Sequence, residues 1–143
     1  MASGGKASAG AHVYPLRVYY EDTDAGGVVY HANYLRFAER ARTEMLRQAG
    51  IGQADLWAER GLAFTVRRCD AQFLKPARLD DALEVHTRVI EARCARVAAE
   101  QVVKRAGDEI ARLKLEIACI DRKGRPARLP ETLSAAFAGP AHR

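Results

Sequence analysis

Apolar residues repeat at two different periods along the chain, and the change of period separates a helical part from a part made of strands. Between residues 33 and 49 they recur every three or four positions, with Glu44 and several arginines on the opposite side. This spacing predicts a helix that presses one wide apolar face against a sheet. Asn33 is a suitable N-cap, and Gly50 after Ala49 is a suitable C-terminal glycine, so we expect the helix at Asn33–Ala49.

A second, shorter helix is expected at 53–60 and is ended by Gly61. Before and after the two helices, apolar and polar residues alternate, which predicts antiparallel strands. The alternation changes phase near Arg67-Arg68, which indicates a β-bulge. Ala106 to Glu109 has the composition of a hairpin turn. The expected strands are 15–20, 62–73, 83–89, 97–104 and 111–119, followed by a last short extended piece at 125–129. One long helix among antiparallel strands is an α+β pattern, and the long free edges favour pairing with a second copy.

Length and composition indicate one globular domain. The first 12 of the 143 residues are mostly glycine, alanine and serine, so we expect a disordered tail at 1–12 and a single domain at 13–143. No apolar run can span a bilayer and no signal peptide follows the start, so the expected location is the cytoplasm. Three separated cysteines, Cys69, Cys94 and Cys119, are expected to be buried free thiols.

The net charge is +5, from 23 basic and 18 acidic residues. This surplus suits an anionic partner, whether a nucleotide, a nucleic acid or an anionic membrane. No basic motif with interleaved aromatic residues supports nucleic-acid binding.

The stretch with the most chemistry is an acidic turn that leads directly into the long helix. Glu21, Asp22 and Asp24 precede two adjacent glycines, and His31 follows. Unpaired N–H groups at a helix start can polarise a carbonyl, and a carboxylate facing that carbonyl can attack it or activate a water. Glycine lets a substrate approach the backbone closely. On spacing alone, turn and cap chemistry explains the same residues equally well.

Other interpretations of these polar residues stay open. Asp22, Asp24 and His31 could bind a metal, although their spacing matches no recognised motif. His31 could be an ordinary turn residue. Glu39 could be catalytic, but an ion pair with Arg42 at the edge of the core is the simpler interpretation.

A longer motif changes this balance in favour of catalysis. The chain reads Tyr20-x-Asp22-Thr23-Asp24-x-x-Gly27-Val28-Val29-Tyr30-His31-x-Asn33-Tyr34-Leu35 and continues to Glu39-Arg40-Ala41-Arg42. It resembles the 4-hydroxybenzoyl-CoA thioesterase family of hotdog-fold enzymes, and most closely the bacterial branch associated with the Tol–Pal envelope system. The similarity extends through 73–81 and 118–121 to 128–130.

This resemblance implies a hotdog fold, with a five- or six-stranded antiparallel sheet wrapped around one long central helix. It implies edge-to-edge dimers that often form tetramers, and hydrolysis of acyl-CoA thioesters without metal or cofactor. The family's catalytic aspartate falls on Asp24, and the position whose backbone N–H meets the thioester carbonyl falls on Tyr30-His31. Gly27 and Val28 are then expected to line the substrate site.

Two further expectations follow from the resemblance. Histidine at position 31, where hydroxybenzoyl enzymes have an aromatic residue, makes short aliphatic acyl groups the expected substrates. Arg93 falls in the turn where relatives bind the CoA phosphates, with Arg96 nearby. The alternative is a protein that binds acyl-CoA or acyl carrier protein without catalysis.

Overall fold

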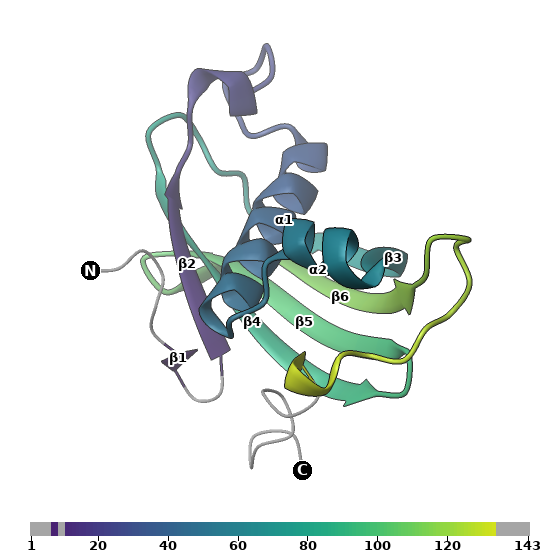
Figure 1. The fold of residues 1–143 in the computed structure, drawn as a ribbon. Coiled ribbons are helices and arrows are strands. Elements are labelled where there is room, and N and C mark those ends of the chain that lie inside the picture. Colours follow the sequence, from purple (N-terminus) through teal and green to yellow (C-terminus); the bar gives the residue numbers. More distant parts are fainter. Residues whose placement is uncertain (1–6, 9–10, 134–143) are drawn as a thin grey trace.

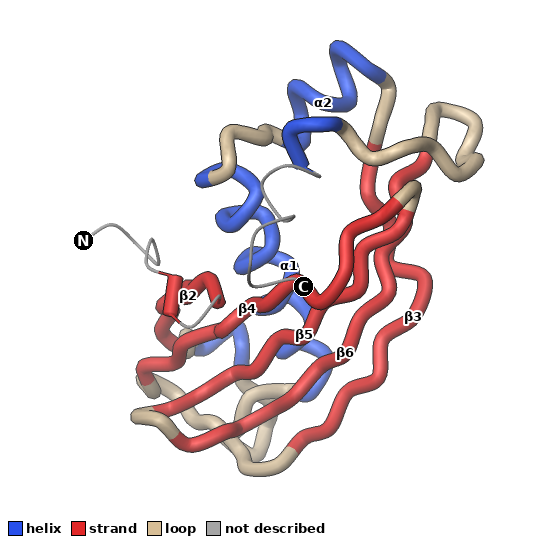
Figure 2. Tube along the Cα trace, turned by 90° about the horizontal axis from the view of Figure 1, so that it is seen from below, coloured by secondary structure: helices blue, strands red, loops and turns tan. Residues whose placement is uncertain are grey.

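The computed structural model describes residues 7–8 and 11–133. A single curved antiparallel sheet wraps around the long helix α1 (His31–Gln48), as Figures 1 and 2 show. Six strands lie in the order β1-β2-β4-β5-β6-β3, which confirms the α+β class predicted from the sequence. The strands are β1 (Ala7–Ser8), β2 (Ala11–Arg17), β3 (Ala63–Phe73), β4 (Ala82–Arg93), β5 (Arg96–Arg105) and β6 (Asp108–Ile120). A 3₁₀ turn η1 (Tyr20–Asp22) and the helix α2 (Gln53–Arg60) complete the set.

The core lies between α1 and the inner face of the sheet. Alternate residues are buried over 83–89 of β4, 97–103 of β5 and 111–117 of β6, because successive side chains of a strand point to opposite faces. The buried residues of α1 are Tyr34, Phe37, Ala38, Ala41 and Leu46. The small Ala38 and Ala41, both fully buried, allow the helix backbone to approach the sheet closely.

Several local predictions are confirmed. Helix α2 runs from Gln53 to Arg60 and ends at Gly61, whose left-handed conformation (φ 66°) favours glycine. The β3–β6 register shifts between Val66 and Arg68, which is the predicted bulge. Residues 106–107 form the hairpin turn between β5 and β6.

Several predicted boundaries are wrong, and β4 runs four residues beyond its predicted end at Val89. Strand β2 begins at Ala11, inside the predicted tail at 1–12, and residues 7–8 pair with it; residues 1–6 and 9–10 of that tail lie outside the described residues. The predicted strand 15–20 ends at Arg17, because pairing with β4 stops there and the chain turns into η1. The extended piece expected at 125–129 joins the sheet only through a single bridge between Pro126 and Ile120.

Candidate active site

Asp24 lies in a turn that is closed by its own hydrogen bonds. Its backbone N–H donates to the carbonyl of Val28 at 2.9 Å, and its Oδ1 accepts from the N–H groups of Gly26 at 2.8 Å and Val28 at 3.4 Å. Gly27 adopts a left-handed conformation (φ 81°) that favours glycine. The side chain of Asp24 is exposed, and no donor in residues 11–133 reaches its Oδ2. One carboxylate oxygen therefore stabilises the turn while the other is free.

Asp22 has a different environment, although it is only two residues away. It is 6% exposed, and its Oδ2 accepts a 2.8 Å hydrogen bond from the N–H of Tyr19. Its carbonyl accepts from the N–H of Tyr30 at 3.0 Å and from Nδ2 of Asn33 at 2.9 Å. Asp22 thus holds the turn against the start of α1, and its buried carboxylate faces the chain rather than the solvent.

The helix begins two residues earlier than predicted. Tyr30 is the N-cap and His31 the first helical residue, whereas Asn33, predicted to be the cap, lies within the first turn and reaches back to Asp22. No partner for the N–H groups of His31 and Ala32 is found in the described part of the chain. These N–H groups can donate to a carbonyl oxygen brought to the helix start.

An aromatic cluster surrounds this helix start. The exposed ring of His31 lies 4.5 Å from that of Tyr30 and 5.8 Å from that of Phe73, measured between centroids. Tyr30 and Phe73 are 48% and 47% exposed, which leaves an apolar surface at the end of β3. The His31 side chain therefore lines the site by contact, while its backbone carries the free donor.

The β3–β4 connection packs against the acidic turn and is bonded to it through the backbone. The N–H of Val29 donates to the carbonyl of Ala77 at 2.8 Å, and the N–H of Ala77 donates to the Tyr34 hydroxyl at 3.1 Å. Val28 forms a bridge with Arg78. Sequence reasoning gave Tyr34 and Ala77 no role in the site. Ala77 is fully buried beneath the turn, and no local pattern in the sequence indicates this contact.

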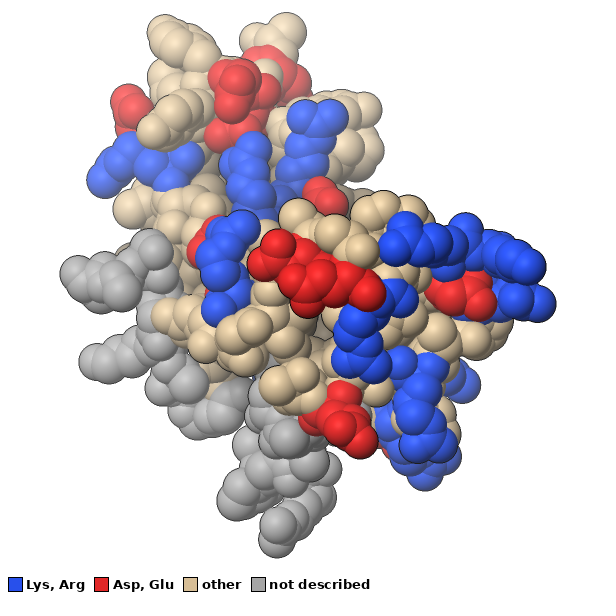
Figure 3. Space-filling view, in the orientation of Figure 1, with Lys and Arg blue, Asp and Glu red and all other residues tan. Residues whose placement is uncertain are grey.

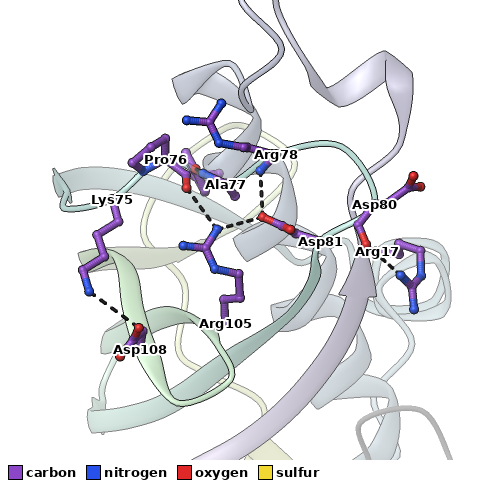
Figure 4. A network of polar contacts seen from close by, with 10 residues as sticks. Arg17, Lys75, Pro76, Ala77, Arg78, Asp80, Asp81, Arg105 and Asp108 are labelled. Carbon is purple, nitrogen blue, oxygen red and sulfur yellow. Dashed lines mark hydrogen bonds and ion pairs between the residues drawn. The ribbon is translucent and has the colours of Figure 1, made fainter.

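A polar network fixes this connection to the sheet (Figure 4). Arg105 donates to the Asp81 carboxylate at 2.7 Å and to the carbonyl of Pro76 at 3.1 Å. Burial alone would raise the pKa of Asp81, but the hydrogen bond from the Arg78 N–H and those from Arg105 outweigh it and lower the pKa. The Arg78 side chain points away from Asp81 in Figure 4, so only its backbone joins the network.

The predicted site residues fall into two groups. Gly27, Val28, Tyr30 and His31 lie together with Asp24 at one end of the molecule. Arg93 and Arg96 do not join them. They face each other in the β4–β5 hairpin beside Ala118 of β6, whereas the helix start lies at the Phe73 end of β3, opposite Ala111. Within one chain these arginines lie at the opposite end of the sheet from Asp24.

The predicted ion pair between Glu39 and Arg42 is wrong. Arg42 instead donates to Oε1 of Gln101 at 3.0 Å, and no salt bridge of Glu39 occurs among the described residues. Gln101 is fully buried and donates through Nε2 to the carbonyl of Ala38 and to Oγ1 of Thr87, both at 2.9 Å. Burial lowers the pKa of Arg42. Sequence reasoning missed this network because its members lie up to 63 residues apart.

The cysteine prediction also needs correction. All three cysteines are free, but Cys94 is exposed and Cys69 half-buried, so only Cys119 is a buried thiol. Burial raises the pKa of both Cys69 and Cys119.

The alternative of a metal site at Asp22, Asp24 and His31 finds no support in this geometry. Asp22 directs its carboxylate to Tyr19, and no metal-binding group of three His, Cys, Asp or Glu side chains occurs in the described ranges. Among the described residues, no helix is both long enough and apolar enough to cross a membrane.

Comparisons with known proteins place this geometry in a family. The profile of the thioesterase-like superfamily matches residues 18–137. The chain is 45% identical over 126 residues to the acyl-CoA thioester hydrolase YbgC of Escherichia coli O6:H1, covering 87% of this chain and 93% of that protein. It is 46% identical over 125 residues to the acyl-CoA thioesterase YbgC of Haemophilus influenzae, covering 87% and 92%.

Solved structures agree with the sequence matches. The crystal structure of a probable thioesterase from Bartonella henselae matches with a TM-score of 0.81 and 40% identity, over 84% of this chain and 99% of that one. The 1,4-dihydroxy-2-naphthoyl-CoA thioesterase Slr0204 from Synechocystis matches with a TM-score of 0.85 over 94% and 100%; at 24% identity it supports the fold alone. The predicted hotdog fold and the predicted enzyme class, a thioester hydrolase, are confirmed. The chain belongs to the thioesterase-like superfamily.

Proposed function

We propose that the protein hydrolyses acyl-CoA thioesters to the free acid and CoA, with short aliphatic acyl groups as substrates and without a metal or other cofactor. The observation that supports this best is the free Oδ2 of Asp24 in the turn that leads into α1, where the N–H groups of His31 and Ala32 have no partner among the described residues. The names of the Escherichia coli and Haemophilus influenzae relatives support the same substrate class.

In the proposed mechanism the thioester carbonyl oxygen accepts a hydrogen bond from the His31 N–H. The positive end of the α1 dipole adds to this polarisation. Gly27, Val28 and Tyr30 line the approach of the substrate. Holding Oδ1 of Asp24 in the turn directs the free oxygen outward.

Two chemical routes fit this arrangement. In the first, Asp24 attacks the carbonyl carbon, the C–S bond breaks, CoA leaves as a thiolate, and water hydrolyses the mixed anhydride. In the second, Asp24 takes a proton from a water molecule whose oxygen attacks the carbonyl carbon directly, and the C–S bond breaks to release CoA as a thiolate. A single turnover in ¹⁸O-water distinguishes them, because attack by Asp24 leaves ¹⁶O in the product and labels the enzyme.

The proposed active unit is a homodimer, or a homotetramer built from it. Strand β3 is the outer strand of the sheet, so its free edge can pair with that of a second copy. Pairing of antiparallel edges would bring the Arg93 and Arg96 end of one copy to the same side as the Asp24 end of the other. Arg93 and Arg96 would then bind CoA phosphates for the partner's site.

The proposed location is the cytoplasm, where acyl-CoA is made. Acyl carrier protein is a second candidate carrier of the acyl group. Association with the Tol–Pal system rests on the sequence resemblance alone.

Hydrolysis of CoA esters of different acyl lengths tests the proposal directly. Turnover that needs Asp24 supports an enzyme. Tight binding of acyl-CoA or acyl carrier protein with no turnover would support the non-catalytic alternative instead.

A further inference from the structure

The connection 74–81 between β3 and β4 holds Ala77 by both of its peptide groups (Figure 4). In the group that precedes Ala77, the carbonyl of Pro76 accepts a hydrogen bond from Nη1 of Arg105 at 3.1 Å. The N–H of the same group, which belongs to Ala77, donates to the Tyr34 hydroxyl at 3.1 Å. This peptide plane is therefore fixed on one side by β5 and on the other by α1.

The second peptide group of Ala77 is fixed in the same way. Its carbonyl accepts from the N–H of Val29 at 2.8 Å, and its N–H, which belongs to Arg78, donates to Oδ2 of Asp81 at 2.9 Å. The same Oδ2 accepts from Nη1 of Arg105 at 2.7 Å, so one ion pair joins the two peptide groups. Ala77 is fully buried, and its partners are these protein groups.

The direction of the Ala77 carbonyl decides where α1 begins. Because the N–H of Val29 is bound to it, Tyr30 stays extended (φ −64°, ψ 132°) and His31 becomes the first helical residue. The N–H of His31 is one of the free donors of the helix start. If the carbonyl turns away, Val29 is released and the donor two residues later loses its fixed direction.

The far end of the connection is also anchored, and its backbone has a rare conformation. Asp80 lies in the left-handed region (φ 71°), which costs energy in residues other than glycine. Its carbonyl accepts from Arg17 at 2.7 Å, and its N–H donates to the carbonyl of Val18 at 3.0 Å. Such backbone persists only where the surrounding structure holds it, and it is concentrated beside active sites. The connection therefore has one fixed shape, held from β2 as well as from β5.

We propose that Asp81 and Arg105 are positioning residues for thioester hydrolysis. They fix the Ala77 carbonyl and, through Val29, the direction of the His31 N–H that binds the thioester oxygen. This inference rests on the proposed function. An ion pair with a purely structural role would behave differently, because its removal lowers the melting temperature and leaves kcat of the folded protein unchanged.

Asp81→Ala removes the acceptor that Arg78 and Arg105 share, and so tests this role. We expect kcat for a short acyl-CoA to fall about ten- to a hundredfold, because misplacing a reacting group by about 1 Å costs on that scale. KM should change about twofold at most, since the donor acts in the transition state and the CoA phosphates bind elsewhere. A kcat within about twofold of the wild-type value in folded Asp81→Ala overturns the inference.

Glu100→Ala is the matched control. Glu100 pairs with Arg88 at 3.2 Å and with Arg112 at 3.5 Å on the outer face of the sheet, and its side chain is 20% exposed against 26% for Asp81. Its loss should lower the melting temperature in a similar way while kcat stays at the wild-type value. An equal loss of kcat in Glu100→Ala would make the effect one of general stability and overturn the inference.

Two further variants keep the test decisive. Asp81→Asn retains an acceptor oxygen and should recover most of the kcat lost in Asp81→Ala; a kcat as low as that of Asp81→Ala would count against the inference. Arg105→Met removes the shared donor and replaces Asp81→Ala if that protein does not fold. Wild-type kcat in folded Arg105→Met overturns the inference equally.

Hydrogen exchange of the Val29 amide, measured by NMR, tests the same link without turnover. Because this N–H donates to the Ala77 carbonyl, its exchange should become about tenfold faster or more in Asp81→Ala and stay unchanged in Glu100→Ala. Unchanged exchange in Asp81→Ala overturns the inference. Failure of the proposed function has a different signature, since Asp24→Asn then keeps full hydrolysis whatever the Asp81 variants do.

Discussion

The side chain of Asn33 donates a 2.9 Å hydrogen bond to the backbone carbonyl of Asp22. The first turn of α1 therefore holds the acidic turn by its backbone, together with the N–H of Tyr30, which donates to the same carbonyl at 3.0 Å. Neither contact uses the carboxylate of Asp24. The turn and the helix start form one unit in which that charge stays exposed.

Replacing Asp24 by asparagine should abolish most turnover. An asparagine Oδ1 can still accept from Gly26 and Val28, so the turn should persist while the charge is lost. Loss of an essential nucleophile or base costs a factor of about 10² to 10⁴ or more in kcat, and KM should change far less. Steady-state kinetics with a short acyl-CoA measures both. The control is Asp22→Asn, for which we expect a smaller loss, because Asp22 binds Tyr19 rather than facing solvent. Near-wild-type kcat in folded Asp24→Asn would refute the mechanism.

Two substitutions at His31 separate its backbone from its side chain. Proline is favoured at the first position of a helix, so His31→Pro should fold while it deletes one N–H. We expect His31→Pro to nearly abolish kcat and His31→Ala to reduce it moderately, through loss of contacts with Tyr30 and Phe73. Circular dichroism should first establish that both are folded. Equal rates for the two variants would exclude a role for the N–H.

Arg93→Ala should raise KM for acyl-CoA roughly two- to fivefold with little change in kcat, since an exposed ion pair is worth at most about 1 kcal/mol. The side chain of Arg93 is 78% exposed and its ion pair with Glu91 is long, at 3.9 Å, so its charge stays available to a phosphate. Added salt should weaken wild-type binding in the same way. A thioester without the CoA nucleotide is the matched control, because its KM should not respond to the substitution. An unchanged KM for acyl-CoA would rule out the assignment.

Light scattering at micromolar concentration should give at least twice the chain mass of 15.7 kDa. Val66, 41% exposed on the outer strand, is the residue to test: Val66→Lys puts a charge on the free edge and should shift the protein towards monomer. Val102→Lys, on the strand β5 between two neighbours, should not. A stable and active wild-type monomer would contradict both the dimer and the shared site.

The protein should become less stable as the pH falls, because of His12. Its ring is 8% exposed, and its nitrogens have no hydrogen-bond partner in the described chain. Burial lowers its pKa, and Glu44 and Gln48 of α1 oppose this only in part. The unfolded chain takes up a proton near the ordinary value of 6.5, so the stability present above this pH is lost as the pH falls towards the folded pKa.

Thermal melts between pH 5 and 7.5 measure this effect. His12→Leu should remove the dependence and stabilise the protein by about 1 kcal/mol at the acid end, because an unpaired buried polar group is lost. His86→Gln is the control. His86 pairs with Glu84 on the face of β4 that is turned away from the core, so this variant should keep the pH dependence. If His12→Leu melts with the wild-type pH profile, another group is responsible.

Local signals in the sequence predicted the features that depend on few neighbours. Gly61 ends α2 because its backbone is left-handed, and the phase change at Arg67-Arg68 marks the bulge because each strand face has its own pattern. The start of α1 was misplaced by two residues for the opposite reason. Tyr30 stays extended because Val29 is bound to Ala77, a contact 48 positions away that no local pattern contains.

The site was predicted in the same uneven way. The motif placed Asp24 and His31 at one helix start, and the structure has both residues there, while their roles stay predictions. It could not predict that Arg93 and Arg96 lie at the far end of the sheet, because strand order decides this. Arg42 binds Gln101 rather than the predicted Glu39, and this too depends on which strand packs against the helix.

The hydrogen bond between Gln101 and the carbonyl of Ala38 has a consequence for how the enzyme can diverge. Apolar packing holds a helix along its axis only through the fit of its side chains, because the hydrophobic effect itself has no direction. This directional bond in the middle of α1, together with the Arg42–Gln101 bond one turn further along, holds the helix from the centre of the sheet as well as from the acidic turn. Changes in the aromatic cluster can therefore accumulate while the middle of the helix stays in place, so new acyl specificities can arise with the proposed carbonyl-binding donor still in position.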